Sequence, residues 1–99
     1  MKKGNCIQVA CDNIIENKTE NLMFCYAYVY SDTHKKRILH AWNELQDVVF
    51  DFSNEHQIVM RKEKYYELGK IKEKDVTKTN REETFRLMIK TKSYGGWII

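Results

Sequence analysis

The chain has 99 residues, 42% of them hydrophobic and 31% charged, and its formal net charge is +3. These values predict one globular domain, over residues 1–99, with a single modest core. No run is long and apolar enough for a membrane helix, and the opening residues MKKGNC lack the hydrophobic region of a signal peptide. We therefore expect a cytoplasmic protein without a membrane partner.

The first part of the chain predicts a helix followed by a strand. Apolar residues recur at helical spacing over Asn5–Asn17, and Asn5 is a candidate N-cap that would place Cys6 in the first turn. Met23–Tyr30 alternates aromatic residues with small or aliphatic ones, a pattern typical of a strand. We expect the small-residue side of this strand to lie under the helix.

Two further strands, Arg37–Leu45 and Val48–Phe52, are predicted to form a hairpin that turns at Gln46 and Asp47. Each strand carries one titratable side chain among apolar neighbours. A buried imidazole and a buried carboxylate are costly to desolvate unless they pair. The hairpin therefore predicts a histidine–carboxylate pair.

The two partners are His40 and Asp51, and their pairing depends on the register in which Leu45 lies opposite Val48. Trp42 then lies opposite Asp51. His40 follows on the same face, one diagonal away and within reach of a hydrogen bond. A slip of one residue would move the carboxylate to the other face of the sheet.

The second half of the chain predicts shorter elements. A short apolar piece at Gln57–Met60 precedes a helix over Lys62–Leu68, which Gly69 ends. Lys70–Thr77 has the lysine-rich pattern of a charged edge strand. The expected fold is α+β, with an N-terminal helix packed on a small antiparallel sheet and a further helix at the C-terminus.

The last helix has a clear start signal, because capping-box spacing occurs at Asn80 and Glu83 and again one residue earlier. We expect it to run to about Lys92. Its expected buried residues are Phe85, Met88 and Ile89, with Leu87 nearby. The apolar tail is expected to pack back onto the body through Trp97.

Three cysteines, Cys6, Cys11 and Cys25, form an odd set without a close CxxC pair. This spacing indicates neither a disulfide framework nor a zinc knuckle, so we expect free thiols, no metal and no cofactor. Cys6 alone lies at a helix start, where the unpaired amides and the macrodipole lower the pKa of a thiol. The same amides can bind the oxyanion that forms during acyl transfer.

These residues suggest a catalytic arrangement in which Cys6 is the nucleophile, His40 the base and Asp51 the group that orients the imidazole. Trp42 on the same sheet face would help to exclude water. Asn5, Gln8 and Trp42 are the candidate oxyanion or cleft residues. Read singly, the thiol, the imidazole and the carboxylate are ordinary structural residues, and only their combination favours catalysis.

Four segments carry a family resemblance: GNC at 4–6, YAYV at 26–29, HAWNE at 40–44 and VFDFSN at 49–54. Together they resemble the transglutaminase-like branch of the papain-like fold, in which a helix-start cysteine precedes a sheet that bears His and then Asp. The resemblance implies the roles just given to Cys6, His40 and Asp51. The segment from Tyr65 to Trp97 also resembles the C-terminal part of small bacterial and phage proteins with this core. Ala27 and Phe52 stand where the family often has glycine and proline.

The leading functional hypothesis is a cysteine-dependent hydrolase or acyltransferase that acts on an amide, peptide or glutamine carboxamide through a thioester. One alternative is a catalytically degenerate member of the fold that binds a protein or a small ligand. Another is a nucleic-acid contact through Lys62–Lys78, although acidic residues interrupt its lysines and a solvated mixed-charge surface explains them better. A zinc site built from the same three residues lacks a close-spaced ligand pair.

Overall fold

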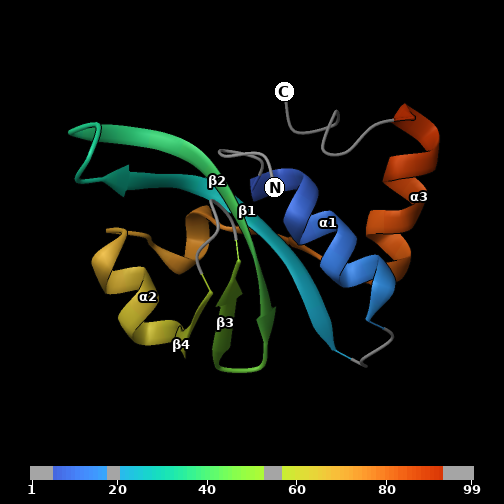
Figure 1. The fold of residues 1–99 in the computed structure, drawn as a ribbon, viewed down its shortest axis with the longest axis horizontal. Coiled ribbons are helices and arrows are strands. Elements are labelled where there is room, and N and C mark those ends of the chain that lie inside the picture. The colour runs from blue at the N-terminus through green and yellow to red at the C-terminus, as the bar shows by residue number, and fades with distance from the viewer. Residues whose placement is uncertain (1–5, 18–20, 53–56, 93–99) are drawn as a thin grey trace.

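The computed structural model describes residues 6–17, 21–52 and 57–92. They form an α+β fold, as predicted (Figure 1). In chain order the elements are α1 (Cys6–Glu16), β1 (Leu22–Ser31), β2 (Lys36–Leu45), β3 (Val48–Asp51), β4 (Ile58–Arg61), α2 (Lys62–Leu68), the short 3-10 helix η2 (Glu73–Asp75), β5 (Thr77–Thr79) and α3 (Arg81–Thr91).

The strands form one five-stranded antiparallel sheet in the order β4-β3-β2-β1-β5. The β2–β3 hairpin has the predicted register, with Leu45 opposite Val48 across a two-residue turn. Gln46 in this turn has a φ of 55°, in the left-handed region that tight hairpin turns require. The register that the histidine–carboxylate pair needs is therefore present.

One face of the sheet packs against α1, and α3 lies beside α1 (Figure 1). The buried cluster here joins Ala10, Cys11 and Ile14 of α1 to Leu22, Phe24 and Ala41 of the sheet. Asn43 also points to this side, and its Nδ2 donates to the carbonyl oxygen of Ala10 at 2.9 Å. This bond ties the middle of α1 to β2.

The opposite face packs against α2. Its cluster joins the small residues of β1 to three large aromatic side chains: Cys25, Ala27, Val29, Trp42, Val49, Tyr65 and Tyr66. The expectation that the small-residue side of β1 lies under the N-terminal helix is therefore wrong. The aromatic side, with Phe24 and Tyr26, faces α1, while the small residues leave room for Trp42 and the two tyrosines of α2.

In the second half of the chain, the expected strand Lys70–Thr77 also needs correction. The edge strand is β5 rather than Lys70–Thr77, because Lys70 takes a left-handed φ of 51° after α2 and Glu73–Asp75 forms η2. The helix Lys62–Leu68, followed by Gly69 as its C-cap, is confirmed. Among the described residues, no helix is both long and apolar enough to cross a membrane.

The start of α3 is confirmed, with a capping box in which Asn80 and Glu83 bind each other's backbone amides. Its predicted buried face is wrong in part. Phe85 is 50% and Ile89 61% exposed, whereas Thr84 is fully buried. The guanidinium of Arg81 donates to a main-chain carbonyl of α1, so the face of α3 that bears Arg81, Thr84 and the partly buried Met88 turns inward instead. The tail with Trp97 lies outside the described residues.

Candidate functional site

His40 and Asp51 form the predicted pair. The Nε2 atom of His40 lies 2.7 Å from Oδ2 of Asp51, and their side chains are 13% and 8% exposed. His40 lies opposite Ala27 in the β1–β2 register, which leaves space for the imidazole ring. Trp42 stacks against the ring, with the two ring centres 6.2 Å apart.

Cys6 is the first residue of α1, as expected, and is 8% exposed. The pairing of β2 with β3 runs from Leu45 back to Asn43. Just beyond this point the sheet has a crevice whose lining includes Cys6, Ala41 and Asp51. The His40 ring and the Ala41 backbone lie near enough to the thiol to lower its pKa. The structure thus brings together three residues that lie far apart in the sequence.

The acid–base properties of the thiol and the imidazole are coupled. Burial alone would raise the pKa of Cys6, but the hydrogen bonds with His40 and Ala41, together with the charge of His40, lower it below the ordinary value. Burial alone would lower the pKa of His40, but Asp51 and Cys6 raise it to about 9. Both shifts favour the thiolate–imidazolium form of the pair over the thiol–imidazole form.

The other two cysteines differ sharply from Cys6. Burial and the nearby charge of Asp12 raise the pKa of Cys11 to about 12. Burial and Glu44 also raise the pKa of Cys25. Both side chains are fully buried, so they remain protonated core thiols, as expected from their positions in the helix and the strand.

Sequence reasoning missed Tyr65 of α2. Its hydroxyl donates to Oδ2 of Asp51 at 2.7 Å, the same oxygen that binds His40. The Tyr65 ring also packs on Trp42, with ring centres 5.3 Å apart. The only available signal was an aromatic pair in an otherwise charged segment, and the sequence does not show which strand residue each tyrosine contacts.

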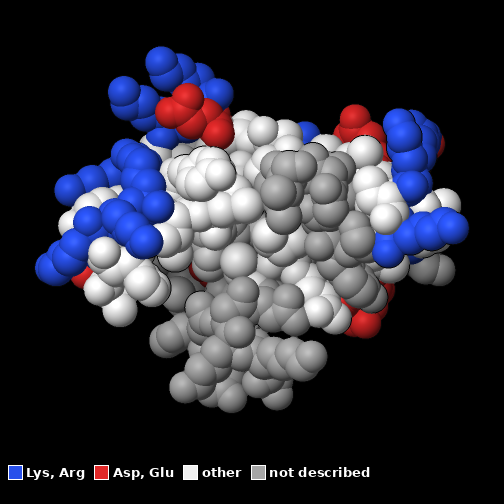
Figure 2. Space-filling model, turned by 90° about the horizontal axis from the view of Figure 1, so that it is seen from above, with Lys and Arg blue, Asp and Glu red and all other residues white. Residues whose placement is uncertain are grey.

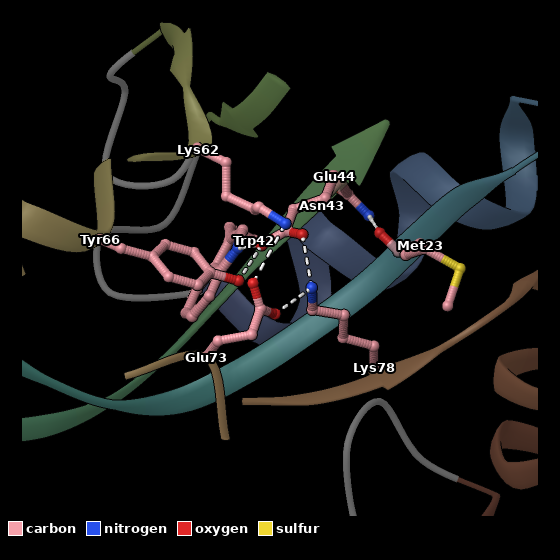
Figure 3. A network of polar contacts seen from close by, with 8 residues as sticks. All are labelled: Met23, Trp42, Asn43, Glu44, Lys62, Tyr66, Glu73 and Lys78. Carbon is pink, nitrogen blue, oxygen red and sulfur yellow. Dashed lines mark hydrogen bonds and ion pairs between the residues drawn. The ribbon is translucent and has the colours of Figure 1, made fainter. Parts of the chain in front are cut away.

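A second polar network lies next to this site and is centred on Glu44, which is 2% exposed (Figure 3). Its Oε2 accepts hydrogen bonds from Nε1 of Trp42 at 2.8 Å and from the hydroxyl of Tyr66. Its Oε1 lies 3.1 Å from Nζ of Lys78, which also pairs with Glu73 at 2.6 Å. The N–H of Trp42 is thus bound to Glu44, while its ring lies beside the ring of His40.

Little space is open beside the Cys6 thiol. The crevice at Cys6 is too small for a water molecule. It shares Asn43, Phe50 and Phe52 with a neighbouring groove of about 260 Å³ on the α1 side of the sheet, which Asn13, Asn17, Leu22 and Leu45 also line. Of the other cleft candidates, Gln8 lies partly buried in α1, and Asn5 lies outside the described residues.

The lysines of the Lys62–Lys78 segment are largely engaged. Lys62 pairs with Glu73 at 3.1 Å, and Lys70 lies over the ring of Tyr30 at 4.3 Å from its centre. On the face drawn in Figure 2, Lys and Arg side chains gather at two opposite ends, with Asp and Glu beside them. Among the described residues, the lysines of this segment therefore lie in a mixed-charge surface.

No group of three or more His, Cys, Asp or Glu side chains suited to hold a metal ion occurs within residues 6–17, 21–52 and 57–92. Comparison of the chain with protein-family models, with curated proteins and with solved structures found no match.

Proposed function

We propose that the protein is a cysteine-dependent hydrolase or acyltransferase of amide substrates, with Cys6 as nucleophile, His40 as acid and base, and Asp51 as the group that orients the imidazole. The observation that supports this most strongly is that Cys6 and Asp51 line one crevice, where Asp51 binds His40 at 2.7 Å. The pKa of Cys6 is lowered and that of His40 is raised to about 9, in one enclosed place. A thiolate held beside a proton donor is what acyl transfer to sulfur requires.

The proposed reaction begins when the Cys6 thiolate attacks the carbonyl carbon of an amide. Because Nε2 of His40 is bound to Asp51, Nδ1 is the ring nitrogen left to give its proton to the leaving amine. A thioester on Cys6 and a free amine result. Neutral His40 then takes a proton from water or from an acceptor amine, which attacks the thioester and releases the acyl group and the thiolate. The proton that His40 took up restores the imidazolium.

The resemblance to transglutaminase-like proteins supports this proposal through the order of the three residues and through the position of Cys6 at a helix start. We extend the proposal to a cytoplasmic location, where the three free thiols would stay reduced. The substrate is proposed to be a peptide, a protein side-chain carboxamide or a small amide.

A second candidate function is a ligand-binding module derived from such an enzyme. The narrowness of the crevice at Cys6 favours it, because a substrate carbonyl needs room beside the sulfur. The adjoining groove of about 260 Å³ would then be the binding surface. The two candidates differ in whether the thiol can be acylated.

The experiment is acylation by p-nitrophenyl acetate at neutral pH, followed by mass spectrometry of the intact protein and of its peptides. The hydrolase or acyltransferase should release a burst of p-nitrophenol, carry one acetyl group on Cys6, and lose the acetyl group again with time. Cys6→Ala should abolish the burst, and His40→Ala should slow both steps. Cys11→Ala is the matched control and should behave as the wild type. A folded protein in which Cys6 is not acetylated would exclude the enzymatic proposal and leave the binding module.

A further inference from the structure

Two adjacent tyrosines of α2 bind the two buried carboxylates of the sheet. Tyr65 donates to Asp51, and Tyr66 donates to Glu44. The tyrosines are 9% and 8% exposed, so neither hydroxyl is simply a surface group. Both are hydrogen bonds from a tyrosine hydroxyl to a carboxylate. Only the bond of Tyr65 reaches the carboxylate that also binds His40.

The Tyr65 hydroxyl and the His40 ring share one oxygen of Asp51, each at 2.7 Å. The carboxyl group of an aspartate turns easily about its last side-chain bond. A second donor on Oδ2 fixes the rotation at which this oxygen faces Nε2 of His40. Burial and the charge of Asp51 raise the pKa of Tyr65, so its hydroxyl stays protonated and remains a donor at neutral pH.

We propose that Tyr65 is a positioning residue of the site, which holds Asp51 in the orientation that keeps His40 protonated beside Cys6. The inference rests on the function proposed above for His40. Tyr65 does not touch the sulfur in this role. It acts through Asp51, and the packing of its ring on Trp42 fixes the direction of its hydroxyl.

Tyr66 provides a matched control. Tyr65→Phe and Tyr66→Phe each remove one buried hydroxyl from the same helix and leave one carboxylate with one donor fewer. Trp42 and Lys78 still hold Glu44 after Tyr66→Phe. If Tyr65 is only a packing residue, the two variants should affect His40 equally.

The experiment follows the ring protons of His40 by NMR between about pH 5 and 11, and His40→Gln identifies the signal. In the wild type the midpoint should lie near the pKa of about 9. In Tyr65→Phe it should fall by about one pH unit, the equivalent of one hydrogen bond to a charged group. In Tyr66→Phe it should stay at the wild-type value. Tyr65→Met, which also lacks the hydroxyl, replaces Tyr65→Phe if the latter does not fold.

An unchanged midpoint in Tyr65→Phe would overturn the inference. So would a higher one, because it would show that the hydroxyl only withdraws negative charge from Oδ2 and does not orient it. The acetylation assay on the same proteins separates this inference from the proposed function. If wild-type Cys6 is acetylated but His40 titrates alike in both phenylalanine variants, the role of Tyr65 alone is refuted. If wild-type Cys6 is not acetylated, the proposed function fails whatever the titration shows.

Discussion

Glu44→Ala should be among the most destabilising substitutions on the α2 side of the sheet. The carboxylate is 2% exposed and accepts from Trp42, Tyr66 and Lys78 (Figure 3). Its removal leaves the buried donors of Trp42 and Tyr66 without an acceptor, at about 1–3 kcal/mol each. Lys78 keeps its other partner, Glu73, at 2.6 Å and contributes less to the loss. We expect the free energy of unfolding to fall by about 3–5 kcal/mol.

Urea unfolding followed by far-UV circular dichroism measures this loss, provided that the slope of the transition is unchanged. Glu73→Ala is the control, since it removes a carboxylate from the same network whose side chain is 56% exposed. It should cost at most about 1 kcal/mol. The reasoning is refuted if Glu44→Ala costs no more than Glu73→Ala.

Three further predictions concern stability and can be measured in the same assay. Asn80→Ala removes the capping box of α3 and should cost about 1 kcal/mol; a loss near zero would show that the cap does not matter in this context. Asn43→Leu removes the hydrogen bonds that the Asn43 side chain donates to the carbonyl oxygens of Ala10 and Met23, which should cost about 2 kcal/mol. It should also slow the alkylation of Cys6, because α1 is no longer tied to β2; unchanged alkylation would argue against that tie. The double substitution of Phe85 and Ile89 by serine should change stability by less than about 1 kcal/mol, because both side chains are at least half exposed; a larger loss would mean that this face of α3 is covered.

The sequence was sufficient to predict the part of the site that lies within the β2–β3 hairpin. The alternation of side chains and a two-residue turn together allow one register, and that register places His40 one diagonal from Asp51. The helix start at Cys6 was likewise visible in local spacing. Both features depend on residues that are close in the chain, so the periodicity of apolar and polar residues predicts them.

The contacts that cross between layers could not be predicted in the same way. The bond from Tyr65 to Asp51 depends on how α2 packs on the sheet, and two adjacent tyrosines point to different carboxylates only in three dimensions. The prediction assigned the two faces of β1 to the wrong layers, because side-chain volume decides which face packs against which helix. The bulk of Trp42 and the tyrosines needs the small residues of β1 opposite, and periodicity alone gives no information on that choice.

The buried face of α3 was predicted wrongly for a related reason. Phe85 and Ile89 are the more apolar residues, but the bonds of Arg81 to α1 and the burial of Thr84 fix the rotation of the helix. Polar contacts at the start of the helix thus outweigh the hydrophobic pattern of its middle.

The most direct test of the central claim is the reactivity of each cysteine toward iodoacetamide as a function of pH, measured peptide by peptide in the folded protein. The lowered pKa of Cys6 predicts that its alkylation profile lies at lower pH than that of an ordinary thiol, whose pKa is 9.0. Cys11 and Cys25 should stay unmodified over the same range, because burial raises both of their pKa values. His40→Ala should move the profile of Cys6 to higher pH. Equal reactivity of the three thiols, or a Cys6 profile that His40→Ala leaves unchanged, would contradict the assignment of Cys6 as a nucleophile.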